Sequence, residues 1–209
     1  MDSLKELALG GLYSPELEHD GCGVGVVANI NGNKSHQIID EGLQVLINLG
    51  HRGACGRDPE TGDGAGILIQ MPHAFFQKEC ARLGMTLPPA GEYGVGMIFL
   101  PPQPQAETRS QALIERVIDE EGLELLGWRD VPVDLGKIGR DARAVCPRIR
   151  QVFIGRGAQV ESPEHLERKL YVVRKVIEHS VMDCGLTEEE ADYFTFAACP
   201  ATPSCTKAC

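Results

Sequence analysis

The chain has 209 residues, and its hydrophobic content of 43% is ordinary for a globular protein. Its formal net charge is −10, because 30 acidic side chains outnumber 20 lysines and arginines, which argues against nucleic acid and anionic membrane surfaces as partners. No apolar run approaches the roughly 18 residues that a membrane-spanning helix needs, so no membrane partner is expected.

Residues 1–21 form a polar leader in front of a cysteine. The leader carries five acidic side chains and no apolar core, so it is unlike a secretory signal or a transit peptide. We therefore expect a cytoplasmic protein. The eight cysteines of the chain include no CxxC pair, so we interpret them as free thiols and expect no metal site.

Cys22 stands at the head of an apolar, glycine-spaced run over residues 23–30, which predicts a buried strand. Two interpretations of this cysteine stay open. A free cysteine at the start of a strand is often only a small, inert, buried side chain. If the leader is removed, however, Cys22 becomes the first residue, and its own α-amino group can activate its thiol. The ordinary pKa values of the two groups, near 8 and near 8.5, make this proton transfer nearly balanced.

The segments that follow predict a helix and a loop. Residues 31–33 (NGN) indicate a turn, and the apolar spacing after them predicts a helix with Ser35 at its N-cap. Residues 50–66 form a glycine-rich loop. In such a loop the planar guanidinium of Arg52 is suited to binding a carboxylate at two points, although a solvated surface turn is an equal alternative.

The rest of the chain predicts a mixed α/β fold without internal repeats. We expect strands over residues 65–71, 93–100, 123–133, 149–154 and 193–198. We expect helices that begin at Pro72, over residues 108–121, and at Ser162-Pro163, the last with a buried stripe of Leu166, Leu170, Val173, Ile177 and Val181.

Four groups of residues resemble the glutaminase domain of glutamate synthase large subunits. They are residues 12–15 (LYSP) with 18–25 (EHDGCGVG), 48–54 (NLGHRGA) with 58–68 (DPETGDGAGIL), 127–132 (GWRDVP), and 167–175 (ERKLYVVRK). The resemblance implies a class II glutamine amidotransferase with the Ntn-hydrolase fold. That fold is a four-layer α/β/β/α sandwich, which we expect to be incomplete on the C-terminal side of this chain.

The same resemblance implies the roles of two site residues. Cys22 corresponds to the mature N-terminal nucleophile, residues 1–21 correspond to a propeptide, and Arg52 corresponds to the arginine that holds the α-carboxylate of glutamine. The thiolate attacks the side-chain amide of glutamine, forms a glutamyl thioester and releases ammonia for glutamate formation from 2-oxoglutarate.

Other parts of the enzyme are implied to lie outside these 209 residues. The oxyanion-hole residues follow further along the family's chain, so we expect residues 1–209 alone to be inactive, because losing one oxyanion donor typically costs about 100- to 1000-fold in rate. FMN, an iron–sulfur cluster, the electron donor NAD(P)H or ferredoxin, and a small electron-donating subunit are likewise assigned to the full-length enzyme.

Residues 22–196 follow the family, whereas residues 197–209 depart from it. A back-translation of residues 198–209, read two bases later, gives nearly the serine-rich strand of the family, so we infer a change of reading frame near residues 195–198. The segment contains Pro200 and Pro203, and we expect it to be non-native. The alternative function is a small metal- or redox-binding protein that uses the terminal cysteines Cys199, Cys205 and Cys209, whose spacing fits no common zinc pattern.

Overall fold

The structure, a computed structural model, describes residues 23–53, 60–62 and 64–199. The chain divides into two compact units. The first, here called the N-terminal unit, comprises Met1–Arg57 and Gly62–Ile67. The second, here called the sheet unit, comprises Asp58–Thr61 and Leu68–Cys209.

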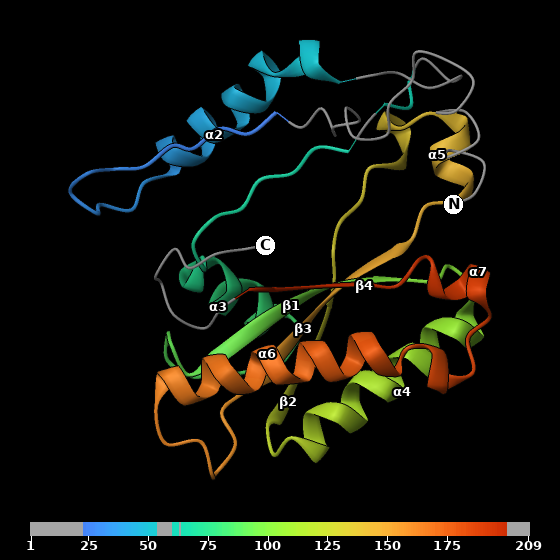
Figure 1. Cartoon of the computed structure of the whole chain (residues 1–209). Helices are drawn as coiled ribbons and strands as arrows, with labels where there is room; N and C mark the ends of the chain where they lie inside the picture. Colours follow the sequence, from blue (N-terminus) through green and yellow to red (C-terminus); the bar gives the residue numbers. More distant parts are fainter. Residues whose placement is uncertain (1–22, 54–59, 63, 200–209) are drawn as a thin grey trace, which may run out of the picture. The chain divides into compact units, whose positions relative to one another are not determined.

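Within the described residues, four strands of the sheet unit form one sheet in the order β2-β3-β1-β4 (Figure 1). The central strand β1 pairs antiparallel with β3 on one side and with β4 on the other, and β2 pairs with β3. The four predicted strands of this region are confirmed, with bounds that differ by a few residues: β1 (Tyr93–Leu100), β2 (Glu124–Asp130), β3 (Arg148–Gly155) and β4 (Thr195–Cys199).

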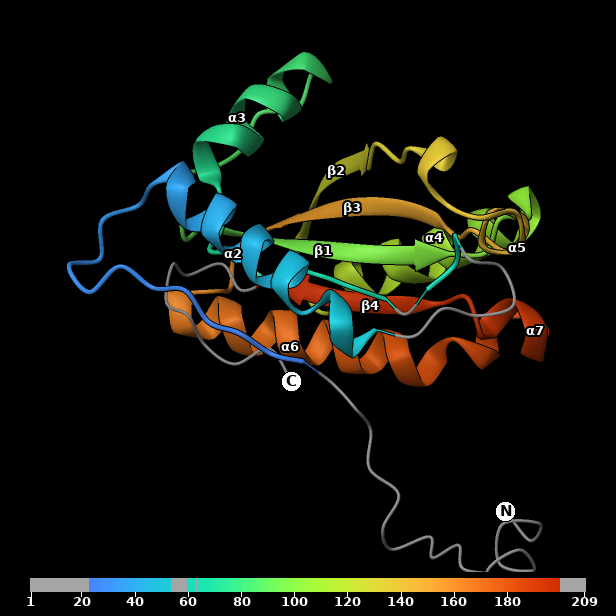
Figure 2. The same ribbon diagram turned by 90° about the horizontal axis from the view of Figure 1, so that it is seen from above.

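Two long helices, α4 (Pro104–Glu120) and α6 (Pro163–Ser180), cover one face of the sheet (Figure 1). α6 runs alongside β4, as the view from above shows (Figure 2). The expected stripe of α6 is confirmed, because all five of its side chains are buried. The close approach of α6 to β1 requires glycine, since a Cβ atom added to Gly94 would lie 2.5 Å from Cδ1 of Leu170.

The opposite face of the sheet is covered in part by α3 (His73–Arg82). Phe76 and Cys80 of this helix pack in one cluster with the alternate sheet residues Tyr93, Val95 and Phe153. The predicted helix is confirmed. The apolar residues that support this helix in the sequence are Ala74, Phe75, Cys80 and Leu83. Of these Cys80 is buried, but the aromatic side chain that packs inward is that of Phe76, while Phe75 is 49% exposed.

The N-terminal unit contains α2 (His36–Asn48) and the short 3-10 turn η2 (Gly50–Arg52). The turn before α2 is confirmed by Gly32, which has a φ of 71° and donates its N–H to the carbonyl of Asn29. Ser35 stands at the N-cap of α2 as expected, but its side chain accepts no hydrogen bond there.

Two strand predictions are wrong. Residues 23–30 and 65–71 adopt no strand, and the apolar side chains of the first run are open to solvent, with Val24 84% and Val26 87% exposed. A strand satisfies its backbone groups only through a neighbouring strand, and within the described residues neither segment takes part in the sheet. A second sheet, which the four-layer sandwich requires, is therefore not formed by the part of the chain that the structure describes.

No helix among the described residues is long and apolar enough to cross a membrane.

The last strand and several short elements complete the sheet unit. β4 continues through Cys199, which pairs with Val95, and so extends three residues into the segment that was expected to begin at residue 197. Residues 200–209 lie outside the described residues. The short elements are η3 (Leu135–Lys137), α5 (Arg140–Ala144), η4 (Met182–Cys184) and α7 (Glu188–Ala191).

Candidate active site

Arg52 lies in a closed turn at the C-terminal end of α2. The N–H of Leu49 makes the last helical bond, to the carbonyl of Val45 at 3.0 Å, and the helix ends at its C-cap, Leu49, whose ψ of 2° is no longer helical. The N–H of Arg52 then donates to the carbonyl of Leu49 at 2.8 Å, and the N–H of Gly53 donates to that of Gly50 at 3.3 Å. The side chain of Arg52 is exposed, so its guanidinium is open to a ligand from solution.

Gly23, the residue that follows Cys22 in the chain, packs against this same turn. A Cβ atom added to Gly23 would lie 3.2 Å from Cδ2 of Leu49 and 3.5 Å from Cγ of Arg52. A side chain at this position would therefore meet the stem of the predicted carboxylate-binding arginine, so the backbone next to the predicted nucleophile lies close to that stem. Cys22 itself lies outside the described residues.

Glycines also let two segments approach α2 closely, namely the run after Cys22 and the residues that follow the glycine-rich loop. A Cβ atom at Gly25 would lie 2.3 Å from Cγ1 of Val45, which excludes any larger residue without movement. Farther along, a Cβ atom at Gly42 would lie 2.9 Å from Cδ1 of Ile67, so the chain returns to α2 after the glycine-rich loop. The helix therefore carries the segment after the cysteine, the arginine turn and the end of the loop, although residues 54–59 and 63 are outside the described residues.

His51 is the residue of this turn to which sequence reasoning gave no role. Its Nδ1 lies 3.0 Å from the carbonyl oxygen of Asn48, the last residue of α2. A carbonyl oxygen only accepts, so Nδ1–H donates and the ring satisfies one of the unpaired carbonyls at the helix end. The available signal was a basic residue just past a predicted helix, where such side chains bond the last carbonyls.

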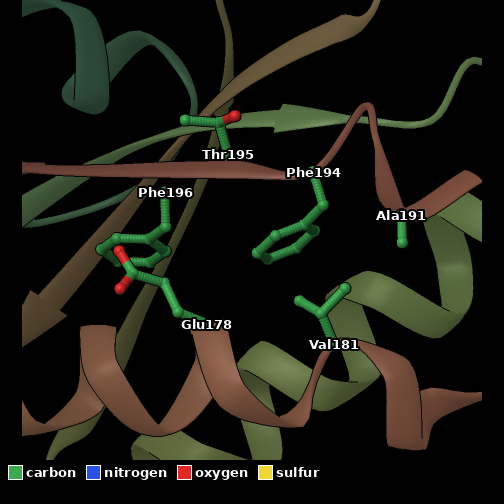
Figure 3. Close-up of a pocket in the computed structure, with 6 residues that line it drawn as sticks. All are labelled: Glu178, Val181, Ala191, Phe194, Thr195 and Phe196. Atoms are coloured by element: carbon green, nitrogen blue, oxygen red, sulfur yellow. The ribbon is translucent and has the colours of Figure 1, made fainter. Parts of the chain in front are cut away.

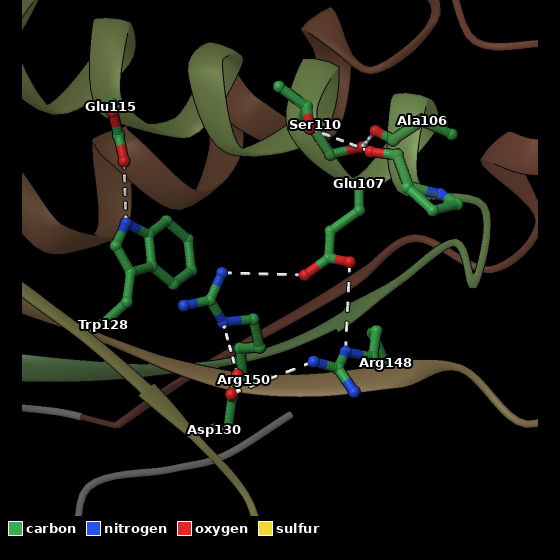
Figure 4. A network of polar contacts seen from close by, with 10 residues as sticks. Ala106, Glu107, Ser110, Glu115, Trp128, Asp130, Arg148 and Arg150 are labelled. Atoms are coloured by element: carbon green, nitrogen blue, oxygen red, sulfur yellow. Dashed lines mark hydrogen bonds and ion pairs between the residues drawn. The ribbon is translucent and has the colours of Figure 1, made fainter.

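The charged residues of the sheet unit are engaged with one another. Glu107 of α4 pairs with Arg150 of β3 at 3.6 Å, and Asp130 of β2 pairs with the same guanidinium at 2.8 Å (Figure 4). Arg150 also lies over the ring of Trp128, 5.1 Å from its centroid, and the indole N–H donates to Glu115 at 2.8 Å. This network joins β2 and β3 to α4, so we assign these charged residues a structural role and not a catalytic one.

A buried cation on the other face of the sheet is also satisfied. Arg129 is only 9% exposed and donates from Nη1 to Oε1 of Gln151 at 2.9 Å. Glu79 lies 3.7 Å from its other terminal nitrogen, and the guanidinium lies over the ring of Phe75 at 5.5 Å. Burial raises the pKa of the adjacent Cys80 thiol. The charge of Arg129 lowers this pKa by less than burial raises it, so Cys80 is not an activated nucleophile.

The pocket in Figure 3 does not offer catalytic groups. It encloses about 300 Å³ between α6, α7 and β4 and is lined mainly by apolar side chains, among them Val181, Phe194 and Phe196. Glu178 is its only ionisable group. Burial alone would raise the pKa of that carboxyl, but hydrogen bonds from Lys175 and Arg174 outweigh burial and lower it, so the carboxylate stays charged and paired.

No group of three or more histidine, cysteine, aspartate and glutamate side chains within the described residues is arranged to hold a metal ion. The terminal cysteines Cys205 and Cys209 lie outside those residues. Among the described residues, Arg52 presents an exposed guanidinium, a group suited to binding an anion, near the segment that follows Cys22.

Comparison with known proteins identifies the family. Residues 22–201 match the model of the class-II glutamine amidotransferases, and this match begins at Cys22. The chain is 47% identical over 184 residues to the glutamate synthase [NADPH] large chain of Bacillus subtilis, with 88% of this chain and 12% of the relative covered. These matches do not support the alternative of a small metal- or redox-binding protein.

Two further relatives are glutamate synthases from eukaryotes. The ferredoxin-dependent glutamate synthase 1 of Arabidopsis thaliana is 38% identical over 164 residues, covering 78% of this chain and 10% of the relative. The glutamate synthase [NADH] of Schizosaccharomyces pombe is 38% identical over 175 residues, covering 81% and 8%. The chain spans about a tenth of the length of these relatives. Because the family model matches most of its residues, the chain belongs to the class-II glutamine amidotransferases, enzymes of the Ntn-hydrolase class.

Proposed function

We propose that this chain supplies the glutamine-hydrolysing chemistry of a glutamate synthase, with Cys22 as the nucleophile and Arg52 as the group that binds the α-carboxylate of glutamine. One observation carries the proposal, namely the proximity of Gly23, the residue after the cysteine, to the side-chain stem of Arg52, which lies 3.5 Å from a Cβ atom placed on Gly23. It supports a site in which the segment after the cysteine and an exposed cation lie side by side. The start of the family match at residue 22 supports the same nucleophile.

The proposed reaction needs a free α-amine on Cys22, because that amine takes the thiol proton. The thiolate then attacks the carbon of the side-chain amide and forms a tetrahedral adduct. When the adduct collapses, the C–N bond breaks and the nitrogen leaves as ammonia with the proton returned by the amine. Water next attacks the glutamyl thioester, the C–S bond breaks, and glutamate and the thiol are released.

Arg52 contributes binding and orientation. Its planar guanidinium presents two parallel N–H groups to a carboxylate, a geometry that lysine cannot reproduce. Held at its α-carboxylate beside the segment that follows Cys22, glutamine would have its side-chain amide directed away from Arg52 and toward the thiol. Holding the reacting groups in this orientation can supply a large part of the lowering of the activation free energy in an enzyme.

We also propose which partners complete the reaction. The names of the relatives specify NADPH, NADH or ferredoxin as electron sources for those proteins. FMN and an iron–sulfur cluster, which would supply the redox chemistry that adds ammonia to 2-oxoglutarate, are assigned to other parts of the enzyme, since the relatives are about ten times as long as this chain. The acidic leader supports a cytoplasmic location, and the net charge of −10 supports the absence of nucleic acid.

The proposal is tested by transplanting residues 22–199 into the matching segment of the Bacillus subtilis large chain. Ammonia release from glutamine should stay within about tenfold of that of the parent enzyme, and Cys22→Ala should abolish it. N-terminal sequencing of the active protein should begin at Cys22. A folded chimera that releases ammonia equally well with Cys22→Ala would overturn the assignment of the nucleophile.

A further inference from the structure

The turn that carries Arg52 is short and is attached to α2 at a helix end. Helix ends leave carbonyl groups without backbone donors, so they are weak points unless a side chain bonds them. Here His51 does so, because its Nδ1–H donates to the carbonyl of Asn48 at 3.0 Å. In the neutral ring this leaves Nε2 without a proton, and His51 is exposed.

The histidine lies between the two residues of the turn that contact Gly23. Leu49 precedes it and Arg52 follows it, and both lie within 3.5 Å of a Cβ atom placed on Gly23. Backbone hydrogen bonds close the turn upon itself, through Arg52 to Leu49 and Gly53 to Gly50. The side chain of His51 adds a bond of a different kind, since it joins the middle of the turn back to the last residue of the helix.

We propose that His51 is a positioning residue for Arg52, and that its bond to the Asn48 carbonyl fixes the direction in which the guanidinium meets the carboxylate of glutamine. This inference rests on the proposed function, because it concerns the substrate-binding role of Arg52. His51 acts through the turn and is not assigned contact with the reacting atoms.

The test uses the active chimera described above, in which Cys22 has a free α-amine, and two alkylating probes that react with the same thiol. One is an analogue of glutamine in which a chloromethyl ketone replaces the side-chain amide, and the other is chloroacetone, which has the same reactive group without the amino acid. In both cases the thiolate displaces chloride and forms a C–S bond. Mass spectrometry of the peptide that contains Cys22 gives both rate constants, and their ratio measures recognition of the amino-acid part.

Removing the hydrogen bond should lower this ratio. We expect His51→Leu to reduce it about three- to tenfold, the effect of one hydrogen bond, while the chloroacetone rate stays unchanged. His51→Gln, which again offers an N–H donor, should restore the ratio to within about twofold. His179→Leu is the matched control, because His179 bonds a carbonyl of its own helix, that of Lys175, at 2.7 Å in the sheet unit and should leave the ratio unchanged.

The outcomes separate this inference from the proposed function. If Arg52→Lys lowers the ratio and His51→Leu does not, the role of His51 is wrong and the proposed function stands. Equal losses in His51→Leu and His51→Gln would also overturn the inference, since the hydrogen bond would then be irrelevant. A ratio near one in the unmodified chimera, or a ratio insensitive to Arg52→Lys, would refute the substrate-binding role itself and the inference with it.

Discussion

Residues 23–30 and strand β1 share a local pattern and have different structures. Both contain a valine between two glycines followed by further apolar residues. In β1, Val95 is 3% exposed, and the strand pairs with β3 and β4. In the first run, Val24 is 84% exposed and the backbone forms no strand. The comparison teaches that an apolar pattern indicates capacity for a strand, whereas neighbouring strands and covering helices decide whether it forms.

The difference extends to the helices of the two units. α2 of the N-terminal unit has no buried residue, although its apolar side chains recur at helical spacing. α6 of the sheet unit has the same kind of spacing, and Leu166, Val173 and Ile177 are fully buried under the sheet. Because burial of apolar side chains is the main stabilising term, we expect the stability of the molecule to reside in the sheet unit.

The largest expected effect comes from truncating one isoleucine in each unit. Ile98 of β1 is completely buried, so Ile98→Ala should lower the free energy of unfolding by about 2–5 kcal/mol. Ile47 of α2 is 70% exposed, so Ile47→Ala should change it by less than about 0.5 kcal/mol. Urea denaturation followed by circular dichroism measures both. Comparable losses of unfolding free energy in the two variants would show that Ile47 of the N-terminal unit is buried in solution.

The successful predictions are those in which a local pattern also meets the partners it needs. The strand over 93–100 pairs with β3 and β4, and the apolar stripe of α6 packs on the sheet, so both predictions are confirmed. The strands expected over 23–30 and 65–71 fail because pairing is a property of distant segments. For α3, the packing against β1 and β3 selected Phe76, and spacing alone did not indicate which ring faces inward.

Alkaline pH should lower the stability of the sheet unit, because Tyr93 of β1 is buried there. Burial raises the pKa of Tyr93 from 10.0 to about 12, so the folded protein holds this proton more tightly than the unfolded chain does. Its contribution to stability is complete below about pH 10 and is lost between about pH 10 and 12. Two pKa units correspond to about 2–3 kcal/mol of unfolding free energy.

Tyr93→Phe is the matched variant, since it removes the titrating group and keeps the ring. Denaturation at several pH values should show a smaller alkaline loss in this variant, with the remainder including Cys80, whose pKa burial also raises. Ultraviolet absorbance of tyrosinate follows the ionisation directly. A Tyr93 that ionises near pH 10 in the folded protein would contradict the prediction.

Arg52 is an exposed residue of the N-terminal unit, so its replacement should weaken the binding of glutamine and leave the free energy of unfolding unchanged. Arg52→Lys in the active chimera should raise the glutamine KM more than tenfold, because a lost charged hydrogen bond is worth roughly 1.5–3 kcal/mol. Arg140, 87% exposed in its side chain and paired with Asp141, provides the control Arg140→Lys. An unchanged KM in Arg52→Lys would disprove the role of the guanidinium.

Sequence reasoning proposed Cys22 and Arg52 as site residues but did not indicate how the chain places the segment after Cys22 near Arg52. Motifs indicate residue types that suit a reaction, and a glycine-rich loop beside an arginine is such an indication. The packing of Gly23 on Leu49 depends on where α2 ends, which a local pattern fixes only within a residue or two. The uncertain end of the helix also left His51 without a predicted role, because that role depends on the hydrogen bond of its side chain to the last helical carbonyl.

The smallest expected effect compares the N-caps of α6 and α2. Ser162 accepts a hydrogen bond from the N–H of His165 at 3.2 Å, whereas Ser35 holds the same position with the same extended backbone and makes no such bond. Ser162→Ala should therefore lower the free energy of unfolding by about 1 kcal/mol, and Ser35→Ala by no more than a few tenths. Since α6 is packed on the sheet, its cap contributes to global unfolding, while α2 has no buried face to transmit the loss. Equal effects of the two substitutions in urea denaturation would mean that Ser35 bonds its helix in solution and that the two units differ less than the structure indicates.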